Sequence, residues 1–247
     1  MKILLFLIAI VKVCSCLNDS EQSGDYWREI VQDGGLRYDH HDPIVRPCSL
    51  HNVDCIRRFF AHNSRCSPVH KPGSDTHRIK TLPTFMPHIN VTFTLNFLEL
   101  KGLNNYKINE FYINKETDTL VLEVVFPNLR AYSPIIVITY HRRGKEPTQL
   151  ADFGFIEYKD LSLTLTVSHI KDINLSNGHV YAYISDSAPK TGLGPNFTLT
   201  KDPQQQIANA QLLARIDLSL QEAFLTQAPV FMNVFLQNSI CDFKSLN

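Results

Sequence analysis

The sequence predicts an α+β fold, in which a long curved antiparallel sheet wraps around a C-terminal helix and a short disulfide-linked helix lies near the N-terminus. Alternating apolar and polar residues dominate the middle of the chain, and no helical pattern separates these segments. Strands joined by short turns form antiparallel meanders. Beyond residue 202 the periodicity becomes helical. The apolar face of the sheet must be covered, and the C-terminal helix is the best candidate to fill its concave side.

Residues 1–16 have the pattern of a cleaved secretory signal peptide. Lys2 precedes an apolar run of about ten residues, which ends in small residues. This run is well short of the roughly 20 residues that span a membrane, so we expect export without a membrane anchor. Cleavage after Cys16 leaves four cysteines, whereas cleavage after Ser15 leaves a fifth, unpaired thiol, and we favour the first. We therefore expect a secreted, extracellular protein.

The mature chain divides into an arm and a domain. Residues 17–47 are polar and rich in turn formers, and we expect an arm that is poorly ordered unless it docks. Residues 48–247 are expected to form a single domain, since the chain is 44% hydrophobic and can bury a core. Lysine and arginine balance aspartate and glutamate at 24 each, so no nucleic-acid partner is expected.

A short amphipathic helix is predicted after Ser49, which we place at its N-cap. Its apolar residues recur at spacings of three, three and four: Leu50, Val53, Ile56 and Phe60. Asn63-Ser64 is expected to end the helix. A loop rich in proline and glycine follows over residues 68–73.

Alternation from Ile89 to Phe97 predicts the first strand, with one face buried and one face in water. The alternation slips at Phe97-Leu98, which indicates a bulge or bend. Further strands are predicted at 106–113, 120–126, 135–140, 161–167 and 179–185. Asn177-Gly178 is typical of a tight hairpin turn leading into the last of them.

Asp202-Pro203 is expected to begin a helical stretch. Its predicted apolar stripe consists of Leu213, Ile216, Leu220 and Phe224, with Gln205 and other polar residues on the surface. Pro229 is expected to break the helix. A second helix then carries Phe231, Val234 and Phe235 toward the last cysteine.

Four cysteines remain after cleavage, namely Cys48, Cys55, Cys66 and Cys241, an even number that suits an oxidising compartment. Three pairings are possible. If both Cys48 and Cys55 were helical their Cα atoms would be about 10.5 Å apart, beyond the roughly 7 Å of a disulfide, so this pair requires Cys48 to precede the helix. We favour Cys48–Cys55 with Cys66–Cys241. A zinc site is the rival interpretation, but the spacing matches no usual set of zinc ligands.

Acceptor motifs for N-linked glycans occur at Asn90, Asn174 and Asn196, with a fourth at Asn18 beside the cleavage point. In an extended segment, each of the first three asparagines would lie on the face opposite its apolar neighbours. A glycan attached there would project into solvent. We expect at least one of the three to be used.

No motif of known catalytic or cofactor chemistry is present, and we expect neither an enzyme nor a bound metal or cofactor. Ser168 and Lys171 match a Ser-x-x-Lys pattern, but they lie at the end of a predicted strand. The run Asp39–Asp42 contains two histidines and is expected to be solvated. The glycine-containing segment Thr191–Pro195 is expected to be a loop without a phosphate site, because no helix start follows closely.

The segment Pro43–Leu50, continuing through Cys55 to the Asn-Ser-Arg-Cys run that ends at Cys66, resembles fibrohexamerin, the glycoprotein subunit of moth silk fibroin. Asp202-Pro203 with its glutamine-rich continuation, and the final Ile240–Phe243, also resemble that family. The chain differs in its longer N-terminal arm and in having no cysteine between Cys66 and Cys241. More distantly, the plan is similar to the takeout and juvenile-hormone-binding proteins.

Each resemblance implies a function. The first implies a non-enzymatic silk glycoprotein of the silk-gland lumen, which associates non-covalently with the fibroin heavy and light chains and keeps them soluble through secretion. The second implies an extracellular carrier of a small hydrophobic ligand, such as a terpenoid hormone or a lipid. We favour the silk component.

Overall fold

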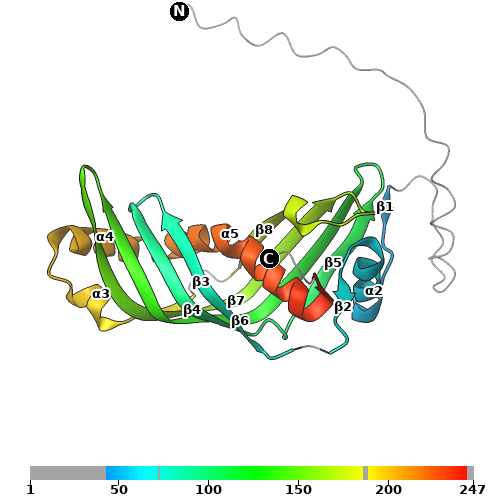
Figure 1. The fold of residues 1–247 in the computed structure, drawn as a ribbon, viewed down its shortest axis with the longest axis horizontal. Coiled ribbons are helices and arrows are strands. Elements are labelled where there is room, and N and C mark those ends of the chain that lie inside the picture. Colours follow the sequence, from blue (N-terminus) through cyan, green and yellow to red (C-terminus); the bar gives the residue numbers. More distant parts are fainter. Residues whose placement is uncertain (1–42, 72, 186–188, 244–247) are drawn as a thin grey trace, which may run out of the picture. The chain divides into compact units, whose positions relative to one another are not determined.

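An eight-stranded antiparallel sheet is the main element of the computed structural model, which describes residues 43–71, 73–185 and 189–243 (Figure 1). The predicted signal peptide and residues 17–42 of the predicted arm lie outside these residues. The strands are β1 (Ile44–Val45), β3 (Thr76–Met86), β4 (Val91–Lys101), β5 (Lys107–Asn114), β6 (Thr119–Arg142), β7 (Lys145–Ser168), β8 (Gly178–Ile184) and β9 (Lys190–Leu193). Their order is β1-β5-β6-β4-β3, with β7 on β6 and both β8 and β9 on β7.

Two strands of 24 residues, β6 and β7, pair with each other and form the centre of the sheet. The first part of β6 pairs with β5 and its second part with β4. The predicted strands at 120–126 and 135–140 are therefore one strand. Pro127 lies where β6 changes partner from β5 to β4, and Pro134 lies at a bulge opposite β7, so neither missing N–H interrupts the ladder.

Alternation did not predict β3. This strand includes Pro83, which is tolerated because β3 is an edge strand, paired with β4 alone among the described residues. The prediction of a tight turn at Asn177-Gly178 was wrong. The connection from β7 to β8 spans residues 169–177, and Gly178 begins β8 with an ordinary φ of −83°.

The predicted bend in the first long strand is confirmed. Phe97 has a φ of +54°, which is unusual for a bulky residue. Before it, Val91 and Phe93 face the core, and after it Leu98 and Leu100 do so. The inward face thus passes from odd to even positions, which lets β4 bend with the sheet.

The C-terminal part forms α3 (Pro195–Leu199), α4 (Pro203–Ala214) and α5 (Ile216–Phe235), followed by a π-helical turn at Leu236–Ile240. Helix α4 starts at Asp202-Pro203 as predicted, and the Asp202 side chain caps it by accepting hydrogen bonds from the backbone of Gln204 at 2.8 Å and Gln205 at 3.4 Å. Pro229 does not break α5. Proline has no N–H, so the carbonyl of Leu225 loses its partner in the helix. Pro229 and Leu225 are both exposed, so water can satisfy that carbonyl.

The predicted apolar stripe was also wrong in part. Arg215, with a φ of −133°, separates α4 from α5 and changes the helical phase. Leu212 is therefore buried in place of Leu213, which is exposed. Gln205 is buried rather than on the surface, and its side-chain oxygen is satisfied by a hydrogen bond from the Thr200 hydroxyl.

Helix α5 covers the concave side of the sheet, which confirms the predicted architecture (Figure 1). It also contacts β3 and β8, the strands at opposite edges. Phe224 packs edge-on against Tyr158 of β7 at 5.0 Å, and Phe235 against Phe126 of β6 at 5.4 Å, measured between ring centroids. Each buried phenylalanine contributes roughly 1.5–3 kcal/mol.

The N-terminal helix, α2 (Val53–Asn63), begins three residues later than predicted. Asn52 is its N-cap, and the Asn52 side chain accepts a hydrogen bond from the backbone of Cys55 at 3.1 Å. The helix buries Ile56 and Phe60 as expected. A small second sheet pairs β2 (Ser67–Pro68) with β10 (Cys241–Asp242). Because β1 pairs with β5, residues 44–45 of the predicted arm are part of the main sheet.

Candidate functional site

Two disulfides hold the ends of the domain, in the pairing that the sequence favoured. Cys48 lies before α2 and bonds Cys55 within it, with a Cα separation of 5.7 Å. Cys66 bonds Cys241 with a Cα separation of 5.6 Å, next to the pairing of β2 with β10. Phe235 and the following π-helical turn are thereby fixed to the N-terminal helix region. These cysteines are structural.

The Asn90 acceptor motif lies in a turn and not in a strand as predicted. Asn90 connects β3 to β4 with a φ of +54°. The side chain is exposed, and its Nδ2 donates a hydrogen bond to the backbone oxygen of His141 at 2.9 Å. Asparagine is among the residues that adopt this left-handed conformation most readily.

The other two acceptor motifs are also exposed. Asn174 is extended, and its Oδ1 accepts hydrogen bonds from the backbone and hydroxyl of Ser176. Asn196 lies in α3 instead of an extended segment, and its Nδ2 donates to the backbone oxygen of Ala151 at 2.9 Å. Of these three asparagines, Asn174 alone has an Nδ2 that donates no hydrogen bond to the residues that the structure describes, so we expect Asn174 to be modified first.

The sequence did not reveal a polar cluster between the β3–β4 turn and α5. His88 Nε2 lies 3.0 Å from the hydroxyl of Ser219, and His88 Nδ1 lies 2.8 Å from a carboxylate oxygen of Glu222. This order of serine, imidazole and carboxylate is also that of a hydrolytic triad. Because His88 is more than 130 residues from both partners in the sequence, no local motif could have shown it.

The geometry around Ser219 does not suit catalysis. The residue is completely buried, so no substrate carbonyl reaches its hydroxyl. Its backbone N–H donates to Arg215 within the helix at 3.0 Å and is not free to stabilise an oxyanion. The cluster therefore ties the β3–β4 turn to α5 and satisfies a buried hydroxyl.

The other candidates for chemistry are not assembled into sites. Ser168 and Lys171 are both exposed at the end of β7. The segment from Thr191 to Pro195 was wrongly expected to be a loop, since β9 ends at Leu193 and α3 begins at Pro195. A buried carboxylate already occupies the start of α3, because Asp152 accepts a hydrogen bond from the backbone of Phe197 at 2.8 Å.

Neither a metal site nor a membrane span is found among the residues that the structure describes. No three histidine, cysteine, aspartate or glutamate side chains gather there in a way that could hold a metal ion. None of the helices in these segments is both long enough and apolar enough to cross a membrane.

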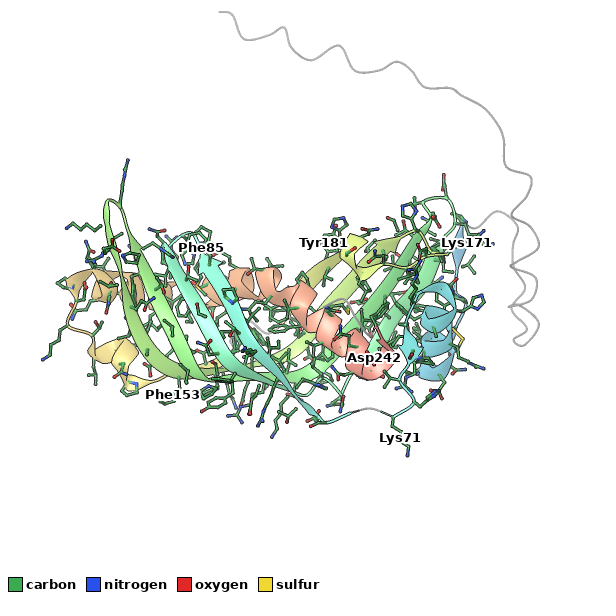
Figure 2. All side chains as sticks on the ribbon, viewed as in Figure 1. Lys71, Phe85, Phe153, Lys171, Tyr181 and Asp242 are labelled. Carbon is green, nitrogen blue, oxygen red and sulfur yellow. A yellow bond between two sulfur atoms is a disulfide. The ribbon has the colours of Figure 1, made fainter. Side chains whose placement is uncertain are left out.

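Exposed apolar side chains lie in a row on the outer face of the sheet, opposite α5. We call Phe97, Ile135 and Phe153 the outer stripe; they are 56%, 45% and 45% exposed. They come from the neighbouring strands β4, β6 and β7, and the pairing of Asn96 with Ile135 places them side by side. Figure 2 shows Phe153 below the ribbon of the sheet. Contiguous exposed apolar patches mark interaction surfaces.

Comparison with known proteins identifies the family. The sequence model described as Fibroin P25 matches residues 44–245. The chain belongs to the Fibroin P25 family. A relative, the fibrohexamerin of Galleria mellonella, is 30% identical over 208 residues, which cover 81% of this chain and 89% of the relative. The Fibroin P25 match begins at the first residue of β1 and includes both disulfides, the outer stripe and α5.

A solved structure of low sequence identity has a similar fold. The crystal structure of Takeout 1 from Epiphyas postvittana aligns with a TM-score of 0.50 and 14% identity, covering 78% of this chain and 94% of that one. At this identity the likeness concerns the fold alone. It agrees with the predicted plan of a wrapped antiparallel sheet and a C-terminal helix.

Proposed function

We propose that this protein is a secreted, non-enzymatic silk glycoprotein that associates non-covalently with the fibroin heavy and light chains and aids their solubility and secretion. Membership of the Fibroin P25 family carries this proposal. The predicted signal peptide and glycan acceptors are consistent with passage through the secretory pathway to the silk-gland lumen.

The surface that fits such a partner is the outer stripe. Silk chains are apolar and aggregation-prone, and exposed apolar side chains on a rigid sheet could bind them. The bend at Phe97 and the bulge at Pro134 turn Phe97 and Ile135 outward at the same place. All described cysteines are paired in disulfides, which supports a non-covalent association.

The test is co-purification of this protein with fibroin from the silk-gland lumen. We expect the wild-type chain to co-purify, and a variant carrying Phe97→Asn, Ile135→Thr and Phe153→Thr to lose most of the association. Asparagine accepts the positive φ at position 97, and threonine suits a strand, so the fold should persist.

The matched control is Leu218→Gln with Leu225→Gln on α5, which removes side chains that are 62% and 56% exposed. This variant should co-purify like the wild type. Recovery of the protein only from haemolymph would refute the proposal. Equal loss in both variants would refute the assignment to the outer stripe.

A second candidate function is carriage of a small hydrophobic ligand, which the likeness to Takeout 1 favours. Against it, aromatic rings pack closely at α5, with Phe224 and Phe231 at 5.3 Å and Phe235 and Tyr106 at 4.8 Å between ring centroids. Native mass spectrometry of secreted protein distinguishes the two. A retained lipid would support the carrier, and a mass that is fully explained by the polypeptide and its glycans would exclude it.

A further inference from the structure

A pocket of about 340 Å³ opens at one end of the sheet, beside α4. Its walls come from the β3–β4 turn at 89–91, the β6–β7 hairpin at 140–145 and the first turns of α4 at 204–211. None of its lining residues belongs to the aromatic cluster of Phe224, Phe231 and Phe235 on α5. Its volume lies in the range of pockets that hold small organic molecules.

The charge on this pocket is one-sided. Arg142, Arg143 and Lys145 all line it, and no carboxylate does. Arg142 is held by a hydrogen bond of 2.7 Å from its Nε to the backbone oxygen of Glu146, which leaves its charge uncompensated. In the part of the chain that the structure describes, neither Arg143 nor Lys145 forms an ion pair.

This charge is a local feature and not a property of the whole chain, whose formal net charge is zero. A concave site lined by one sign of charge concentrates counter-ions far better than a flat surface does. Asp202, which precedes α4, already caps that helix through the backbone of Gln204 and Gln205. The pocket therefore favours an anion.

Apolar side chains also line the pocket. Ile89, Val91 and Ile207 line it, and Ile207 is 59% exposed although it is a large aliphatic residue. Covering an exposed isoleucine with a hydrocarbon chain removes apolar surface from water on both partners. Gln204 and Gln211 add amide groups that can donate hydrogen bonds to an oxyanion.

We propose that this pocket binds a monomeric amphipathic anion, with an aliphatic chain and a carboxylate or phosphate head. The head lies against Arg143 and Lys145, and the chain lies along Ile89 and Ile207. The site goes beyond the association with fibroin, since the outer stripe and the pocket share no residue.

Isothermal titration with decanoate tests the proposal on the full mature chain. We expect one decanoate per chain, with the affinity falling at least tenfold in Arg143→Glu/Lys145→Glu. The control is Lys107→Glu/Lys171→Glu, which changes the net charge equally and should bind like the wild type. Lys171 lies at the other end of the molecule from α4 (Figure 2). Ile207→Gln should weaken decanoate severalfold and leave the circular dichroism spectrum unchanged.

Comparison ligands identify what the pocket recognises. Decyltrimethylammonium should not bind, and inorganic phosphate should bind at least tenfold more weakly than decanoate. Binding of the cation equal to that of decanoate, or no effect of the double charge reversal, would overturn the proposal. Binding to anionic phospholipid vesicles without binding of decanoate would overturn a monomeric ligand and indicate a membrane surface instead. Asn90 lines the pocket and is a predicted glycan acceptor, so the titrations are repeated in Asn90→Gln, which removes that acceptor. In this background Arg143→Glu/Lys145→Glu must still lower the affinity for decanoate.

Discussion

Removal of the disulfide between Cys66 and Cys241 should cost this protein more stability than removal of the other one. The bond joins residues 175 positions apart, whereas Cys48 and Cys55 are only 7 apart. In the chain-entropy account, the longer loop restricts the unfolded chain by about 5 kcal/mol and the shorter by about 2.5 kcal/mol. The expected difference of roughly 2.5 kcal/mol corresponds to about seventyfold in the unfolding equilibrium.

The structure adds a local reason for the larger cost. Besides its packing, the segment after α5 is held by the two-residue pairing of β10 with β2 and by two hydrogen bonds, from Val69 N to Ile240 O at 3.0 Å and from Arg57 Nε to Ser239 O at 2.9 Å. Without the disulfide, this segment and the end of α5 can detach together. Loss of the disulfide therefore also weakens the packing of Phe235.

The measurement is urea unfolding followed by far-ultraviolet circular dichroism. Cys66→Ala/Cys241→Ala and Cys48→Ala/Cys55→Ala are compared with the wild type, and the free energies of unfolding are extrapolated to water. A short-loop variant that loses as much stability as the long-loop variant, or more, would refute the reasoning.

Three further predictions concern the interior. Phe235→Ala should lower the free energy of unfolding by about 3–5 kcal/mol, whereas Leu225→Ala, on the exposed side of the same helix, should change it by less than about 0.5 kcal/mol in the same assay. Burial raises the pKa of Tyr140 to about 12, above the ordinary value of 10 for tyrosine. The stability that this shift contributes to the folded state is therefore fully present below pH 10 and is lost between pH 10 and about 12. Tyr140→Phe should flatten the decline of the free energy of unfolding in that range, measured by urea unfolding from about pH 9 to 12. A fluorophosphonate probe should leave Ser219 unmodified in the native protein, and mass spectrometry of a labelled Ser219 peptide would contradict its structural role.

Local patterns were sufficient where one residue or one period decides the conformation. Asp202 before Pro203 started α4 because a capping carboxylate and a proline both fit the first turn of a helix. The slip at Phe97 located a real bend. By contrast, β3 and the first part of β7 were missed, because their sequences contain proline, glycine and charged residues that only an edge position or a long partner strand can accommodate.

Site prediction from the sequence was likewise limited to residues that a short local motif identifies. The acceptor asparagines and the cysteines are recognisable one at a time, since each carries its chemistry in a short motif. The His88 cluster and the basic pocket are not, because their members come from segments far apart in the sequence, namely the β3–β4 turn, the β6–β7 hairpin and helices more than a hundred residues after that turn.

The sequence by itself determined the α+β class and the covering C-terminal helix, because periodicity is a property of the chain alone. It left three cysteine pairings possible, and the structure has the one that we favoured. Only the tertiary structure decided that α5 continues through Pro229 and that the prolines of β6 fall where no hydrogen bond is needed. It also decided which side chains face outward from the bend. Each of these outcomes depends on a distant partner strand or on the exposure of one face to solvent. Neighbouring residues in the sequence predict neither of these.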